Sequence, residues 1–150
     1  MLLDWALASL HHLAIFTLAG IIVFEVAMTA RAVDDVAILR LARVDTWYGA
    51  VAAIVLAVGA SRVAFGAKGA AYYMVNAFFW TKMGLFVAVG LLSIPPTLAY
   101  LGWRRQLRAD STFRPDAAAL GAVRRYLWTQ VVLFAGIPVA AAAMARGYGM

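Results

Sequence analysis

The first long apolar stretch of the chain runs from Trp5 to Met28 and reads WALASLHHLAIFTLAGIIVFEVAM. A helix of about 20 residues crosses a hydrocarbon core of about 30 Å, so this stretch is long enough to span a membrane. No basic region precedes it and no small-residue cleavage site ends it, which distinguishes it from a signal peptide. We therefore predict a transmembrane helix that remains in the mature protein.

The composition of the whole chain is that of a membrane protein. Of its 150 residues, 65% are hydrophobic and 13% are charged, whereas soluble domains are about 45–50% apolar and about 25% charged. The chain has no cysteine and only two histidines, which excludes disulfide scaffolds and thiol catalysis and argues against the usual zinc sites. The net charge of +6 comes from basic residues between apolar stretches. These positions predict contact with a membrane surface and not with nucleic acid.

Three further apolar stretches predict spans at Asp45–Val63, Val75–Leu101 and Tyr126–Met144. The second is the least regular, because only Trp47–Val58 is continuously apolar. In the third, we expect the tandem Pro95-Pro96 to bend or end the helix. The predicted fold is all-α: a polytopic bundle of four antiparallel transmembrane helices that forms a single domain over residues 1–150.

The segments between the spans differ in character. Ala30–Val44 carries charges of both signs and predicts a short surface helix. Gly66–Ala71 is glycine-rich and predicts a tight connection between an antiparallel pair of spans. Gly102–Arg125 is strongly basic and predicts a loop, which we interpret as a topology signal, with lipid or protein docking as the alternative.

The basic residues predict how the bundle is oriented. The side of the first and third connections holds Arg31, Arg40, Arg43, Arg104, Arg105, Arg108, Arg114, Arg124 and Arg125, and the other side holds Arg62, Lys68, Lys82 and Arg146. Cytoplasmic segments carry the excess of arginine and lysine. We therefore expect a protein of the inner (cytoplasmic) membrane, with both termini facing the periplasm or the cell exterior.

Polar residues gather at the outer half of the predicted bundle. His11 and His12 lie early in the first span and Lys82 lies early in the third, which runs parallel to it, so they share a depth. The same region receives Arg62, Tyr73, Asn76, Trp80 and Arg146. Ionisable groups inside a bilayer usually face the bundle interior and mark function. The alternatives are a snorkelling Lys82, histidines satisfied by backbone or by Tyr and Asn, and tryptophans that form an interfacial belt.

Glu25 lies deeper in the same helix. It follows His11 by a rise of roughly 21 Å, and its direction is within about 40° of that of His11. His11, Leu18 and Glu25 therefore form one stripe, which we expect to face protein and not lipid. The candidate partners of the Glu25 carboxyl group are Tyr48, Thr97, Arg43 and Arg124.

A histidine inside a helical bundle is a common haem iron ligand. Lys82, Arg62 and Arg146 could pair with the haem propionates, or an uncharged Lys82 could approach the iron. Because both histidines lie in one helix, at most one haem fits per chain, unless two chains share one. We favour His11 as the ligand because it shares the stripe with Glu25, whereas His12 is turned by about 100° and would orient a propionate or face a neighbouring chain.

Several segments resemble a bacterial family of four-helix membrane proteins of unknown function, and the resemblance covers nearly the whole chain. They are His11–Thr17 with Glu25, Asp45–Gly49, Arg62–Gly69, Phe79–Lys82, Leu92–Thr97 and Met144–Gly149. In layout this family is similar to the copper-resistance-D-like superfamily, which includes HemJ, the haem-binding protoporphyrinogen oxidase. The likeness to HemJ is a histidine early in the first span and Trp80-Thr81-Lys82 early in the third. It implies haem b binding by His11 or His12 together with Lys82. The doubled histidine, Glu25 and Arg62–Gly69 are not part of the HemJ pattern.

Together these observations predict a membrane protein that binds haem b and has a HemJ-like redox activity. His11, Lys82 and Glu25 are the candidate reactive groups, and the bundle is either single or a homodimer. Two alternatives remain: a small transport protein in which Glu25, His11 and Lys82 relay protons or ions, and a structural or partner-binding subunit without a cofactor.

Overall fold

The computed structural model describes residues 2–66 and 69–149, and these form helices and connections without a strand. The helices are α1 (Leu2–Thr29), α2 (Asp35–Phe65), α3 (Gly69–Val75), α4 (Ala77–Ala109) and α5 (Ala117–Ala145). Every one of them except α3 is long and apolar enough to cross a membrane. The predicted all-α architecture with four spans is therefore confirmed.

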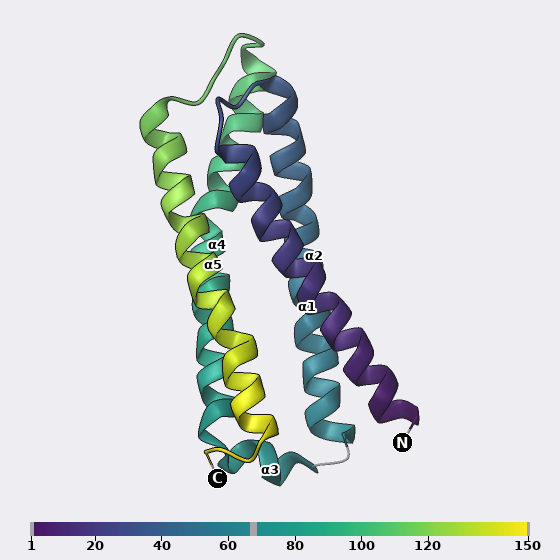
Figure 1. The fold of residues 1–150 in the computed structure, drawn as a ribbon. Coiled ribbons are helices and arrows are strands. Elements are labelled where there is room, and N and C mark those ends of the chain that lie inside the picture. Colours follow the sequence, from purple (N-terminus) through teal and green to yellow (C-terminus); the bar gives the residue numbers. More distant parts are fainter. Residues whose placement is uncertain (1, 67–68, 150) are drawn as a thin grey trace.

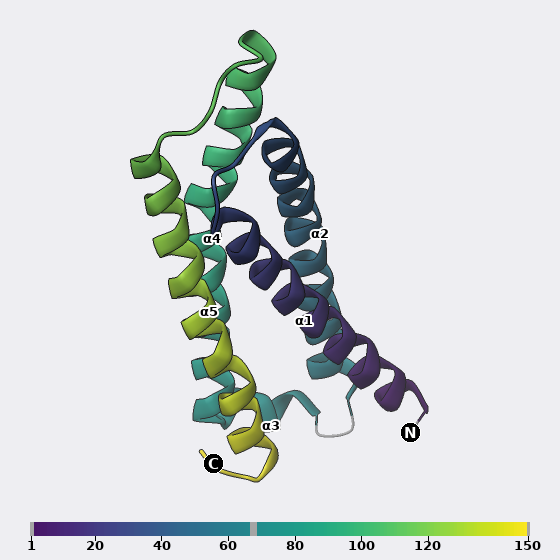
Figure 2. The ribbon, with the colours of Figure 1, turned by 45° about the horizontal axis from the view of Figure 1, so that its top comes forward.

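The four long helices form an antiparallel bundle (Figure 1). The main packing pairs are α1 with α2 and α4 with α5, and α1 also packs against α5. Both termini lie at one end of the bundle, where α3 crosses between α2 and α4; Figure 2 shows the same arrangement from a second direction. We call this the terminal end. The other end carries the connections at residues 30–34 and 110–116, and we call it the arginine end.

Much of the surface of the bundle is apolar, and the buried apolar residues form separate clusters along its axis. Leu18 and Ile22 are buried at mid-height, and Ile38 and Tyr100 are buried toward the arginine end. Outward-facing side chains such as Phe16 are large, apolar and exposed. An apolar surface of this extent on all sides of a bundle is typical of contact with lipid.

The segment expected as a separate surface helix is the first part of α2. Asp34 caps this helix, since its carboxylate accepts a hydrogen bond of 2.8 Å from the backbone N–H of Ala37. Ile38 and Leu41 are fully buried against the other helices. The prediction of a short surface helix over Ala30–Val44 was wrong because the charged residues lie on one face only, while the apolar residues continue the core.

The tandem proline does not end the third span, and α4 continues through it to Ala109. Pro96 has no N–H and cannot bond the carbonyl of Leu92 one turn earlier. The side-chain amide of Gln130 on α5 donates a hydrogen bond of 3.3 Å to this carbonyl. A neighbouring helix thus replaces the missing backbone bond, which is how proline is tolerated inside membrane helices.

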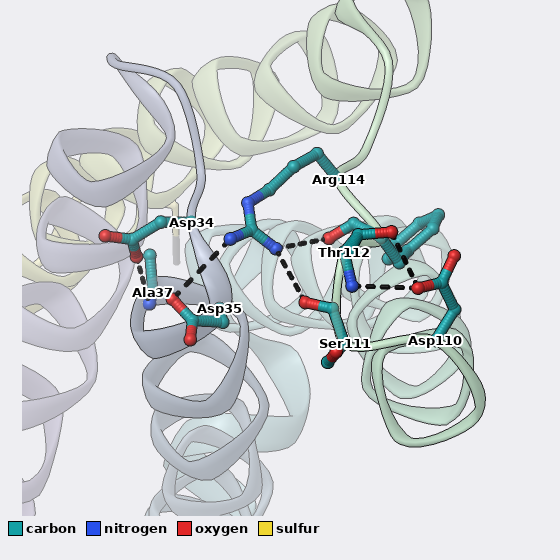
Figure 3. A network of polar contacts seen from close by, with 8 residues as sticks. Asp34, Asp35, Ala37, Asp110, Ser111, Thr112 and Arg114 are labelled. Carbon is teal, nitrogen blue, oxygen red and sulfur yellow. Dashed lines mark hydrogen bonds and ion pairs between the residues drawn. The ribbon is translucent and has the colours of Figure 1, made fainter.

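The basic connection is much shorter than Gly102–Arg125, because α4 runs to Ala109 and α5 begins at Ala117 instead of Tyr126. Its tip is a polar network around Arg114, whose guanidinium lies 3.9 Å from Asp35 and donates to the carbonyls of Ser111 and Phe113 (Figure 3). Thr112 donates two hydrogen bonds to Asp110, and these lower the pKa of that carboxyl group. The ion pair is half-exposed, so it contributes little to stability.

The connection between the second and third spans also differs from the prediction. The segment Gly66–Ala71 is not simply a tight turn, since α3 begins at Gly69 and continues to Val75. Asn76 separates α3 from α4 and caps α4 by accepting hydrogen bonds from the N–H groups of Phe78 and Phe79. Lys68, one of the basic residues counted for this end, lies outside the described residues.

Candidate functional site

A cavity of about 480 Å³ lies inside the terminal end of the bundle. This volume is within the range of about 300–1,000 Å³ that is typical of small-molecule and cofactor sites. All five helices contribute to its lining, and most of the lining is apolar, including Val55, Phe79, Phe86, Phe134, Ile137 and Met144. Its ionisable side chains are His11, Arg62, Lys82 and Tyr73.

His11 reaches the cavity from α1 because α2 has a glycine opposite its ring. A Cβ atom at Gly59 would lie 3.2 Å from Cε1 and 3.7 Å from Nδ1 of the imidazole. Nδ1 is buried and has no partner with hydrogen-bond geometry, although the imidazole lies beside the backbone of Val55 on α2. A buried nitrogen without a partner is rare in proteins, which makes this imidazole a candidate ligand-binding group.

His12 has a different environment, although it is the next residue. Its side chain is exposed on the outside of the bundle, and Nδ1 lies 2.6 Å from the carbonyl oxygen of Ala8 on the same helix. The ring is therefore satisfied by its own backbone. His11 lines the cavity and His12 does not.

The cavity holds positive charge from two sides. The ammonium group of Lys82 lies 5.1 Å from the ring centroid of Phe79 and 5.9 Å from that of Tyr73, which are distances for cation–π contact. The Nε atom of Arg62 is buried without a hydrogen-bond partner. The described lining includes no aspartate or glutamate. The site is therefore suited to an anionic ligand with a large apolar body.

The structure does not bring all the predicted site residues into this cavity. Asn76 is fully buried and has a structural role, since its side-chain amide donates a hydrogen bond of 2.9 Å to the carbonyl of Tyr148 near the C-terminus. Trp80 is exposed, and its indole N–H bonds the carbonyl of Met74. Arg146 follows the end of α5 and is exposed. Sequence reasoning missed Gly59, for which the only signal is a glycine within a predicted span.

Glu25 lies outside the cavity lining, in a second polar cluster nearer the arginine end. It is buried, and Asp45 on α2 is buried in the same part of the interior. Two of the residues expected to bind Glu25 form hydrogen bonds with other side chains. The hydroxyl of Thr97 lies 2.8 Å from Oδ1 of Asp45, and the hydroxyl of Tyr48 lies 3.5 Å from Oε1 of Gln130. The arginines proposed for Glu25 are exposed instead, at positions Arg43 and Arg124. The sequence did not single out Asp45 because the predicted span begins at this residue. In the structure α2 begins ten residues earlier, at Asp35, so that Asp45 lies inside the helix.

The four apolar helices and their internal cavity define a polytopic helical membrane protein. The sequence profile of the family described as "Predicted membrane protein (DUF2214)" matches residues 3–149, so the chain belongs to this family. Comparisons with curated proteins and with solved structures found no match. The family description agrees with the expected four-helix family, and it says nothing of the copper-resistance-D-like superfamily or of HemJ.

Proposed function

We propose that this protein binds haem b in the cavity at the terminal end and is a redox protein of HemJ-like type. The observation that carries the proposal is the combination of groups around one cavity: an imidazole with an unpartnered nitrogen, two cations and an extensive apolar wall. Haem b requires these three features, because it has an iron that accepts a histidine, two propionates and an apolar macrocycle. The layout shared with HemJ supports the same ligand.

The residues of the cavity fit the parts of this cofactor. His11 would supply the iron ligand through a ring nitrogen, and Gly59 leaves the space in which its ring lies. Arg62 and Lys82 would pair with the propionates, because arginine and lysine form strong charge-assisted hydrogen bonds with carboxylates. The aromatic side chains of Phe79, Phe86 and Phe134 would pack against the macrocycle and exclude water.

Bound haem would supply one-electron chemistry, while the protein sets its position and surroundings. His11 would hold the iron in place. The positive charges of Arg62 and Lys82 would stabilise negative charge on the bound group. The alternative relay through His11, Lys82 and Glu25 has less support, because Glu25 is not a lining residue of the cavity.

Haem titration into purified, haem-free protein tests the proposal. We expect a Soret band that saturates at one haem per chain. Lys82→Gln and Arg62→Gln should each weaken binding about tenfold, since a hydrogen bond to a charged group contributes about 1.5–3 kcal/mol and tenfold corresponds to about 1.4 kcal/mol. Arg31→Gln at the arginine end is the matched control and should bind as the wild type does. Binding that is equally strong in all three variants would contradict the assignment of the propionate partners.

A further inference from the structure

A second cluster of polar side chains fills the interior of the bundle between the cavity and the arginine end. Glu25 on α1 is 3% exposed and Asp45 on α2 is 8% exposed. Tyr100 on α4 is fully buried, and Gln130 on α5 is 1% exposed. These groups come from all four long helices and are therefore shielded from lipid as well as from water.

The two carboxyl groups have no cation to neutralise them. Neither Glu25 nor Asp45 forms an ion pair with a basic residue in the part of the chain that the structure describes. The other titratable groups near the pair are the hydroxyls of Tyr48 and Tyr100, which are uncharged at neutral pH. α5 contributes only the neutral Gln130. Two buried like charges without a counter-ion are strongly unfavourable, and carboxyl groups in this situation take up a proton.

The hydroxyl of Thr97 has two oxygen atoms within hydrogen-bond distance. Its Oγ1 lies 2.8 Å from Oδ1 of Asp45 and 3.0 Å from the carbonyl oxygen of Ser93. A threonine hydroxyl has one hydrogen to donate. If that hydrogen goes to the Ser93 carbonyl, as is common one turn back in a helix, the short contact with Asp45 needs a hydrogen on the carboxyl group.

Two more buried atoms of the cluster lack a partner. Oε1 of Glu25 and the hydroxyl oxygen of Tyr100 are both inaccessible and make no hydrogen bond. Buried polar atoms without partners are rare, and an anionic carboxylate oxygen in this position is unfavourable because nothing donates a hydrogen bond to it. The described residues include no set of three or more His, Asp or Glu side chains that could hold a metal ion.

We propose that Glu25 and Asp45 form a proton-binding site inside the membrane span of the protein, in which the carboxyl pair carries at least one proton at neutral pH. In this proposal Asp45 carries a proton and donates it to Oγ1 of Thr97, which donates in turn to the carbonyl oxygen of Ser93. Binding converts a carboxylate into a carboxylic acid and needs no other reactant. The site lies apart from the cavity and does not depend on haem.

Infrared spectroscopy of the haem-free, detergent-purified protein at pH 7 tests this proposal, because a protonated carboxyl group has a C=O stretching band that a carboxylate lacks. We expect the band in the wild type. Asp45→Asn should remove most of it, Glu25→Gln should shift or weaken it, and the double variant should abolish it. Asp116→Asn is the control, since asparagine also caps a helix and should leave the band unchanged. Circular dichroism verifies that each variant is folded.

Three results would overturn the proposal. The first is a wild-type spectrum without the band, which needs no variant. The second is a band that survives in the folded double variant. The third is a band that disappears when NaCl is added at constant pH, which would indicate a sodium site instead. Because the protein contains no haem in this experiment, failure of the proton site and failure of the haem proposal are separate outcomes.

Discussion

His11 and Gly59 show how a single missing methyl group can shape the cavity. The imidazole lies so close to position 59 that a Cβ atom there would be 3.2 Å from Cε1, which is a tight contact. The contact joins α1 to α2, so the position of the ring is set by the neighbouring helix as well as by its own. Any cofactor held by His11 therefore depends on this glycine.

Gly59→Ala should weaken haem binding while the protein still folds. The new methyl group would lie 3.2 Å from Cε1 of His11, so the ring must move by a few tenths of an ångström. Overpacking of this kind costs about 1–3 kcal/mol, and a cost of this size in the bound state corresponds to about a 5- to 150-fold loss of affinity. Gly49→Ala, also on α2 but with open space around its Cβ, is the control. Equal affinity of the two variants in a haem titration would show that haem binding does not depend on the observed position of the His11 ring.

The part of the site that could be predicted from sequence is the part that one helix determines. The rotation of about 100° per residue separates His11 from His12 and places Glu25 on the His11 stripe. Partners from other helices depend on how each helix is rotated and offset against its neighbours. Gly59 and Asp45 are such partners, and no spacing within a single span indicates them.

At the level of the elements, α4 and α5 depend on each other at the tandem proline. Pro96 leaves the Leu92 carbonyl without its backbone partner, and Gln130 supplies a replacement from α5. Apolar length alone predicts the spans of a membrane protein, but it does not show whether a proline ends a helix. That outcome depends on a side chain 34 positions further along the sequence, at Gln130.

Gln130→Leu should destabilise the bundle by about 1–3 kcal/mol, because it leaves the partly buried carbonyl of Leu92 unpaired. In the background of Pro96→Ala the same substitution should cost less, since the alanine N–H can bond the Leu92 carbonyl directly. A double-mutant cycle based on the free energy of unfolding in detergent measures this coupling. Additive effects of the two substitutions would mean that the Gln130 bond does not compensate for the proline.

For the whole molecule, the two ends of the bundle are those that the sequence predicted. Both termini and α3 lie at one end, and the connections at 30–34 and 110–116 lie at the other (Figure 1). The sequence predicted this arrangement because four apolar stretches return the chain to the side where it began. It did not predict that the long helices extend into the connections, because charged residues in these segments interrupt the apolar sequence without ending the helix.

A reporter enzyme fused after Gly149 should show periplasmic activity, because the excess of arginine lies at the opposite end of the bundle. A second fusion within residues 110–116 should show cytoplasmic activity and serves as the internal control. Activity assays in whole cells distinguish the two compartments. The reverse pattern would place the cavity at the cytoplasmic side of the membrane.

The most direct test of the haem proposal is the haem content of protein purified from haem-replete cells, measured per chain for the wild type, His11→Ala and His12→Ala. The two histidines are adjacent in sequence, but only His11 lines the cavity, while His12 faces outward and bonds its own helix. We predict about one haem per chain in the wild type and in His12→Ala, and none in His11→Ala. A wild-type protein without haem, or a His11→Ala protein that retains it, would contradict the account.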